Sequence, residues 1–210
     1  MQPRASVVRQ TLSVVTAALL IASAGAASAA VKKKPKPAPR PKPVCNLVKG
    51  TSTGISDQSL QITSADIASN ATTITSVIRV AKLTGSGQDL SAPTGRAWDL
   101  SFTIDDHAVS LTVYDGPFGV FTSYGKGTAT LDVAKNEVRD SVSLNDLTES
   151  TTFPVKNGAS VLSNFIATTR TNVEAPIKGI GALFNLQPID TAKSNAKYVA
   201  GTPSCVKVGS

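Results

Sequence analysis

Apolar and polar residues alternate most regularly along residues 97–114. The apolar positions of the two halves of this stretch are Trp98, Leu100, Phe102 and Ile104, then Val109, Leu111 and Val113. A strict period of two places one side of a strand against a core and the other side toward water. Because the two runs are separated by Asp105-Asp106-His107, the pattern predicts an antiparallel hairpin.

Shorter runs of the same kind recur along the chain, separated by Gly, Pro and Asn. They predict strands at residues 59–64, 72–83, 97–104, 108–114, 119–124, 127–133, 137–144 and 160–171, and a last short strand at Tyr198 and Val199. The 72–83 and 160–171 runs are apolar on both sides, which is typical of central strands. Gly125-Lys126-Gly127 is predicted to be a hairpin turn, and residues 174–197 a long loop with at most one helical turn. The fold class predicted for residues 45–208 is all-β, a single antiparallel β-sandwich.

Residues 1–29 have the pattern of a secretory signal peptide. Arg4 and Arg9 precede an apolar run, and Ala27-Ser28-Ala29 is a small-x-small cleavage site. We therefore expect a secreted, extracellular protein whose mature chain begins near Ala30. An uncleaved membrane anchor is the alternative, since the apolar run approaches the shortest length that can span a bilayer.

Residues 30–44 are rich in Lys and Pro and predict a disordered, extended linker. Of the 21 Lys and Arg residues, two lie in the signal peptide and six in this linker, which leaves 13 from Cys45 onward against all 14 acidic residues. The folded region is therefore close to neutral, and no nucleic-acid partner is expected. The basic linker is either a spacer or a contact with an anionic envelope polymer or membrane, which leaves association with the cell wall open.

The two cysteines stand at the ends of the predicted domain. Cys45 opens it and Cys205 nearly closes it. An exported chain meets an oxidising environment, where two cysteines permit one intramolecular pairing, so a structural disulfide is expected. A free thiol pair and a redox couple are the alternatives, although a redox couple is more often close in sequence.

Four segments resemble a group of secreted, mainly actinobacterial proteins of unassigned function. They are Cys45–Val48 (CNLV), Ser59–Thr84 (beginning SLQITSADIA), Pro93–Ile104 (PTGRAWDLSFTI) and Ala200–Val206 (AGTPSCV). The core also resembles the β-sandwich of DOMON domains and family-nine carbohydrate-binding modules, which implies sugar binding. The group carries a Gly-Asp-containing acidic stretch where this chain has residues 49–58, with Asp57 as the only acid. That difference argues against a calcium site of the family-nine kind, and no cofactor is expected.

His107 is the single histidine, and with Asp105 and Asp106 it forms the one local cluster of possible metal ligands. Three adjacent residues rarely converge on one ion, and Asp suits turns, so a hairpin turn is the preferred interpretation and a metal contact the alternative. A serine hydrolase would need His107 as its base, but no nucleophile motif accompanies it. A carboxylate pair for glycoside hydrolysis stays open in principle. We expect no enzymatic activity.

Residues 114–124 form the best candidate for a ligand site. The segment carries four aromatic residues framed by Gly and Pro, namely Tyr114, Phe118, Phe121 and Tyr124. Sugar-binding sandwiches present aromatic faces in this way. The preferred alternative is that Phe118 and Phe121 cover an open end of the core. For the whole protein, the sequence favours a secreted, non-enzymatic binding module for a carbohydrate, such as a cell-surface polysaccharide, or for another cell-surface polymer. The alternative is an envelope-associated structural protein whose basic linker makes the contact.

Overall fold

The chain divides into two compact units, residues 1–39 and 40–210. The computed structural model describes residues 40–86, 95–116, 118–151, 155–172 and 186–209, all in the second unit. The predicted signal peptide and residues 30–39 of the predicted linker lie outside the described residues. Among the described helices, none has the length and hydropathy needed to cross a bilayer.

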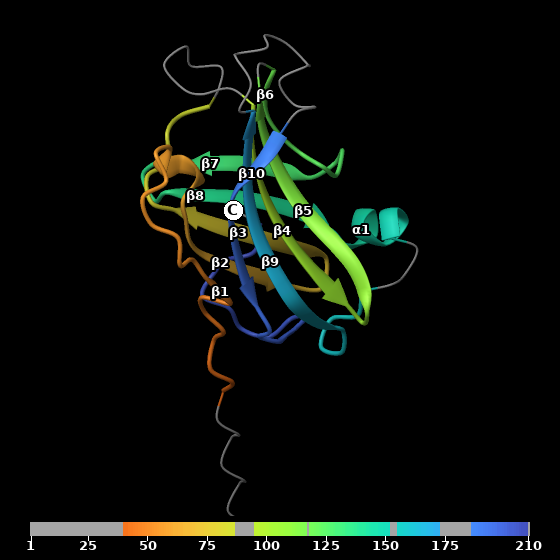
Figure 1. Cartoon of the computed structure of the whole chain (residues 1–210). Helices are drawn as coiled ribbons and strands as arrows, with labels where there is room; N and C mark the ends of the chain where they lie inside the picture. The colour runs from red at the N-terminus through yellow and green to blue at the C-terminus, as the bar shows by residue number, and fades with distance from the viewer. Residues whose placement is uncertain (1–39, 87–94, 117, 152–154, 173–185, 210) are drawn as a thin grey trace, which may run out of the picture. The chain divides into compact units, whose positions relative to one another are not determined.

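Two antiparallel sheets make up the second unit (Figure 1). The strands are β1 (Val48–Lys49), β2 (Ile62–Ser69), β3 (Thr73–Val80), β4 (Arg96–Ile104), β5 (His107–Gly116), β6 (Gly119–Thr122), β7 (Thr128–Asp132), β8 (Glu137–Ser143), β9 (Val161–Asn172), β10 (Leu186–Ser194) and β11 (Tyr198–Val199). A 3-10 turn, η1 (Gln58–Leu60), precedes β2, and a helix, α1 (Leu144–Thr151), follows β8.

The smaller sheet has the strand order β1-β2-β3-β8-β7, and the larger has β10-β9-β4-β5-β6 with β11 paired to β9. Figure 1 shows the sheets face to face, with strands that cross rather than run alongside one another. This arrangement confirms the predicted all-β sandwich. β3 and β9 are interior strands of their sheets, as their apolar patterns predicted.

The β4–β5 hairpin lies in the larger sheet, where the alternation places it. Ile104 pairs with His107, and the two residues between them have positive φ, 46° at Asp105 and 70° at Asp106. Such a two-residue turn matches the twist of the strands it joins, and Asp tolerates the left-handed conformation. The predicted turn is confirmed, and the apolar row from Trp98 to Ile104 faces the core.

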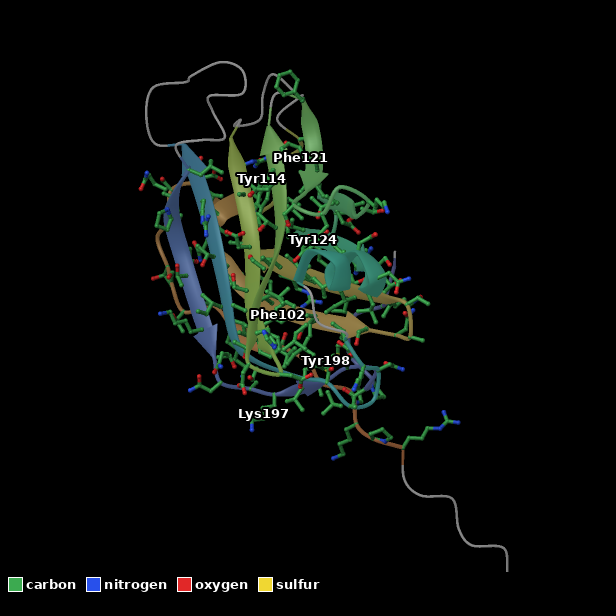
Figure 2. The ribbon with its side chains drawn as sticks, turned by 90° about the vertical axis from the view of Figure 1, so that its right-hand side faces the viewer. Phe102, Tyr114, Phe121, Tyr124, Lys197 and Tyr198 are labelled. Carbon is green, nitrogen blue, oxygen red and sulfur yellow. A yellow bond between two sulfur atoms is a disulfide. The ribbon has the colours of Figure 1, made fainter. Side chains whose placement is uncertain are left out.

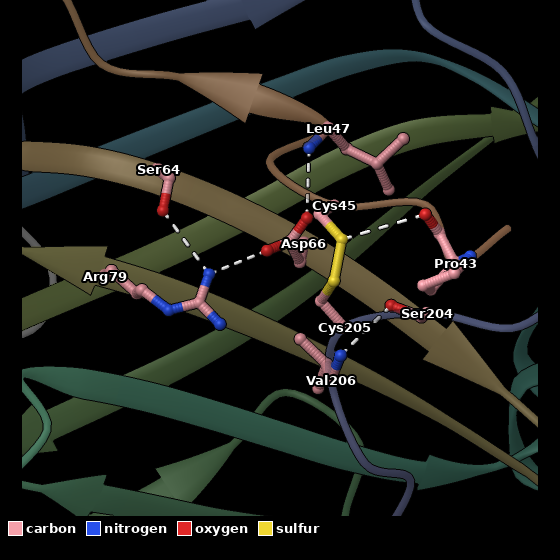
Figure 3. Close-up of a disulfide and its surroundings, with 9 residues drawn as sticks. All are labelled: Pro43, Cys45, Leu47, Ser64, Asp66, Arg79, Ser204, Cys205 and Val206. Atoms are coloured by element: carbon pink, nitrogen blue, oxygen red, sulfur yellow. Dashed lines mark hydrogen bonds and ion pairs between the residues drawn. A yellow bond between two sulfur atoms is a disulfide. The ribbon is translucent and has the colours of Figure 1, made fainter.

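The disulfide joins Cys45 to Cys205, with 5.2 Å between the Cα atoms and 160 residues between them in sequence (Figure 3). It fixes the C-terminal segment on the outer side of the smaller sheet, where Val206 packs against Ala68 and Val77. Gly209 N donates to Thr75 Oγ1 on β3 at 3.0 Å. The predicted structural disulfide is confirmed, and it anchors a segment that covers one sheet.

Three predictions about the elements need correction. Residues 186–194, predicted as part of a long loop, form β10 at the edge of the larger sheet; the rest of that loop, 174–185, lies outside the described residues. The predicted strand at 59–64 divides into η1 and the start of β2, which continues to Ser69. Gly125-Lys126-Gly127 joins strands of different sheets, so it is a crossover turn instead of a hairpin.

Candidate functional site

Tyr114 and Phe121 form a stacked aromatic pair at one end of the larger sheet. Tyr114 on β5 pairs with Phe121 on β6, and the ring centroids are 5.2 Å apart with 21° between the planes. Phe121 is 40% exposed, and Tyr114 is half-buried. The neighbouring Val113 belongs to the core, so the alternation directs the ring of Tyr114 to the outer face. We call these two residues the aromatic pair.

Phe118 lies between β5 and β6, and its side chain is 67% exposed. With Phe121 it supplies two of the three exposed large apolar side chains in the described part of the chain, the third being Val133. Phe118 and Phe121 are exposed and lie outside the main core cluster, which does not support the preferred interpretation that they cover an open end of the core. Their position follows from where the β5–β6 turn projects, which the alternation of residues does not specify.

Tyr124 stands apart from the aromatic pair, as Figure 2 shows. It is half-buried and packs against the main core. Burial raises the pKa of its hydroxyl, and the nearby carboxylate of Asp140 adds to the effect. Tyr124 thus has a packing role. Of the four aromatic residues predicted for the site, Tyr114, Phe118 and Phe121 remain candidates.

Hydroxyl groups cover the same outer face beside the aromatic pair. Ser101 Oγ on β4 donates to Ser110 Oγ on β5 at 3.0 Å. Thr112 Oγ1 donates to Asp99 Oδ1, and Arg170 Nη2 on β9 lies 3.0 Å from Asp99 Oδ2. Asp99 is buried between these partners, whereas Arg170 is half-exposed. The face thus combines rings, hydroxyls and one guanidinium.

Farther along this face, the surface is hollowed over β4, β5 and β9. The hollow has a volume of about 320 Å³ and is lined by Ser101, Thr103, Ala108, Ser110, Asn164 and Ile166 among others. Its small side chains leave room above the sheet. Ring stacking at one end and a mainly apolar hollow at the other form an extended, shallow surface suited to a chain-like ligand rather than an enclosed small molecule.

The Asp105-Asp106-His107 turn has a structural role. Asp105 Oδ1 accepts from Val161 N at 3.1 Å, and Oδ2 accepts from Ser160 Oγ at 2.8 Å. These two hydrogen bonds lower the pKa of Asp105 and tie the hairpin to the start of β9. Among the described residues, no three His, Cys, Asp or Glu side chains gather closely enough to hold a metal ion.

Asp140 is a buried acid that the sequence analysis did not single out. It lies on β8 between Val138 and Val142, in the row that faces the core, and is fully buried. Thr122 Oγ1 on β6, next to Phe121, donates to Asp140 Oδ2 at 2.9 Å. Burial raises the pKa of Asp140 to about 7, against the opposing effect of the Thr122 hydrogen bond. The sequence could have indicated this residue, because Asp140 occupies a position in the strand where the alternation expects an apolar side chain.

A second cluster of charges lies on the opposite outer face, near the disulfide (Figure 3). Arg79 on β3 bridges Asp66 on β2, at 2.6 Å, and Glu137 on β8, at 2.9 Å. Arg139 Nη2 lies 2.8 Å from the same Glu137 carboxylate. Asp66 also accepts the backbone N–H of Leu47 at 3.0 Å. Each acid is paired, and the cluster holds three strands and the N-terminal segment together.

Comparison with known proteins adds no family to these observations. No protein-family model and no curated protein sequence matches this chain.

Proposed function

We propose that this protein is a secreted, non-enzymatic binding module for a carbohydrate or another cell-surface polymer. The outer face of the larger sheet would bind the polymer. The observation that carries the proposal is the exposure of the Phe118 and Phe121 side chains, the second of which stacks on half-buried Tyr114. Trp98, Phe102, Phe165 and Tyr198, by contrast, are buried in the same domain. Exposed rings beside Gly-rich turns are costly for solubility unless a partner covers them.

The chemistry of this face suits a sugar polymer. A sugar ring presents an apolar face of C–H groups that stacks on an aromatic ring, and its edge carries hydroxyls. Ser101 and Ser110 offer groups that both donate and accept hydrogen bonds, and Arg170 offers donors. A polymer that stacks on the aromatic pair and runs toward the hollow would meet all three kinds of group in turn.

The test is retention of the mature protein on purified cell-wall polysaccharide and on a glycan array. Replacing both Tyr114 and Phe121 by Ala should abolish retention, because the stacking surface is removed. Val133→Ser is the matched control, since Val133 is exposed in the turn before β8 and lies on the other sheet. Equal retention of the double variant and the control would contradict the proposal.

The alternative is an envelope-associated protein whose basic linker makes the contact. It is supported by six Lys and Arg residues within residues 30–44, beside a nearly neutral folded region. Deleting residues 32–42 should then abolish retention on anionic liposomes or wall polymer, and salt should screen the retention of the intact chain. Retention that survives both treatments assigns the contact to the sandwich.

A further inference from the structure

The strand that carries Phe121 is the weakest-supported part of the proposed site. β6 has four residues and forms one edge of the larger sheet, where it pairs with β5. All four of its residues are partly or fully exposed to solvent. Short, exposed edge strands open more readily than core strands. The order of the aromatic pair therefore depends on what holds β6 in place.

The contact between Thr122 and Asp140 ties β6 to the other sheet. Along β6 the side chains alternate, so Phe121 faces outward while Val120 packs on the core and Thr122 reaches inward to Asp140 on β8. Asp140 pairs with Ser76 on β3 and Ala129 on β7, so it belongs to the smaller sheet. One hydrogen bond thus crosses the sandwich directly behind the aromatic pair.

Asp140 holds this position with one oxygen unsatisfied. Its Oδ2 accepts from Thr122, whereas within the described part of the chain Oδ1 is buried and has no hydrogen-bond partner. A carboxylate with a bare oxygen in an apolar interior is costly when ionised, and much less so when protonated. Burial accordingly raises its pKa to about 7.

The other charged groups of the surrounding elements have partners of their own. On β5, Asp115 pairs with Arg96, and after β6, Lys126 lies 3.5 Å from Asp146. The charges of β7 and β8 are on their outer sides and are paired as well, Asp132 with Lys135 and Glu137 with Arg139. Tyr124 is the titratable group whose pKa responds to Asp140. Among these groups, no cation lies close enough to Asp140 to stabilise its negative charge.

We infer that Asp140 is a proton-dependent tie that orders β6 and, with it, the aromatic pair: neutral Asp140 keeps the edge closed, and ionised Asp140 loosens it. The ionised carboxylate of Asp140 is stabilised when water reaches it. Water that enters between β6 and the smaller sheet therefore separates Thr122 from Asp140. As a regulation of polymer binding this inference rests on the proposed function, but the opening of β6 is a property of the fold alone. Binding should then be favoured on the acidic side of neutrality.

Hydrogen exchange followed by NMR, on the mature protein from pH 5.5 to 8.5, tests the tie without any ligand. The reporter is the Ser123 amide, which donates to Thr112 O at 2.9 Å, and the reference is the Asn70 amide, which donates to Thr73 O in the β2–β3 turn. After correction for intrinsic rates, protection of Ser123 should fall about tenfold as Asp140 ionises, while the reference stays constant. Equal behaviour of the two amides would overturn the inference.

Three variants separate the tie from general instability. Asp140→Asn has the same shape, cannot ionise and should remove the pH dependence at Ser123. Thr122→Val should reduce protection already at pH 5.5, because the hydrogen bond that ties β6 to β8 is removed. Asp132→Asn, on the outer side of the adjacent β7, is the matched control and should retain the full pH dependence. A pH dependence that persists in Asp140→Asn, or unchanged protection of Ser123 at pH 5.5 in a folded Thr122→Val, would contradict the inference.

The outcome is independent of the binding assays. If exchange at Ser123 responds as expected but no polysaccharide is retained, the tie exists and the proposed function fails. If polysaccharide is retained while Ser123 ignores pH, the proposed function stands and the tie fails.

Discussion

The outer faces of the two sheets differ in the side chains that they present and in how far other parts of the chain cover them. On the smaller sheet, Val206 packs over Ala68 and Val77, and the Arg79 cluster pairs the acids beside them. On the larger sheet, the described residues present serine and threonine hydroxyls, the shallow hollow and the aromatic pair. On the first face the protein's own C-terminal segment covers Ala68 and Val77, while hollows remain over β7 and β8; the second face presents exposed rings.

This difference supports the proposal that a partner binds the larger sheet. Ala68 and Val77 already have contacts with Val206, so a ligand over them would have to displace the C-terminal segment. The rings on the larger sheet gain contacts only when something else approaches.

The largest effect is expected from removing the disulfide. Closing a loop of 160 residues stabilises the fold by about 5 kcal/mol on the chain-entropy model, so Cys45→Ser with Cys205→Ser should lose most of that amount. The C-terminal segment should then detach from the smaller sheet. Urea denaturation monitored by the fluorescence of Trp98 measures the loss, and the reduced wild-type protein should match the double variant. An unchanged midpoint would show that the segment stays in place without the bond.

The pH dependence of stability should come next in size. The pKa of Asp140 is about 7 in the folded chain against an ordinary value of 3.8, so the folded state binds more protons between these values. Stability from this group is fully present below pH 3.8 and is lost as pH rises through about 7. The loss is on the order of 2–4 kcal/mol. Urea denaturation at pH 5 and pH 8 should reveal it, and Asp140→Asn should remove it.

Much of the fold could be predicted because it depends on local pattern. The alternation from Trp98 to Val113 specifies the central hairpin, and Cys45 with Cys205 predicts the closure of the domain. β10 could not be recognised in the same way. A register shift between Pro188 and Asp190 interrupts its alternation, and Asp190 is buried because it accepts hydrogen bonds from Ile62 N and Ser52 Oγ.

The site was harder to predict than the fold, since exposure depends on where a turn lies in the finished sandwich. Tyr114 and Tyr124 are the same residue type and are both half-buried, yet only the ring of Tyr114 lies on the outer face, whereas Tyr124 packs against the core. Pairing across β5 and β6 decides the difference, and pairing is a tertiary property. Asp140 was missed for a related reason: its importance comes from Thr122, which reaches it from the other sheet.

A smaller effect is expected from the ion cluster of the covered face. Arg79→Met would leave Asp66, whose side chain is 1% exposed, with the Leu47 amide as its remaining partner among the contacts described above. A buried carboxylate without its cation costs about 2–3 kcal/mol. Lys135→Met is the control, because Lys135 is well exposed beside Asp132 and should cost less than about 1 kcal/mol. Binding to polysaccharide should be unchanged in both variants, and a loss of binding with Arg79→Met would assign a role to the wrong face.

The smallest effect on stability, and the most informative, concerns two aromatic pairs. Inside the sandwich, Phe102 and Phe165 have ring centroids 5.8 Å apart and are buried, so Phe165→Ala should cost about 3–5 kcal/mol. On the surface, Tyr114 and Phe121 are closer, at 5.2 Å, but face solvent. Removing Phe121 should cost about 0.5–1.5 kcal/mol, the range of a stacking contact measured by a double-mutant cycle.

The two costs decide between a packing role and a binding role for the surface pair. A ring that serves the core contributes to stability whether or not a partner is present, whereas a ring that serves a partner contributes mainly in the complex. We therefore expect Phe121→Ala to leave the urea midpoint close to that of the unmodified chain while retention on polysaccharide falls. If Phe121→Ala instead destabilises the fold as much as Phe165→Ala, the aromatic pair belongs to the core. The main observation in favour of the larger sheet as the binding face would then be lost.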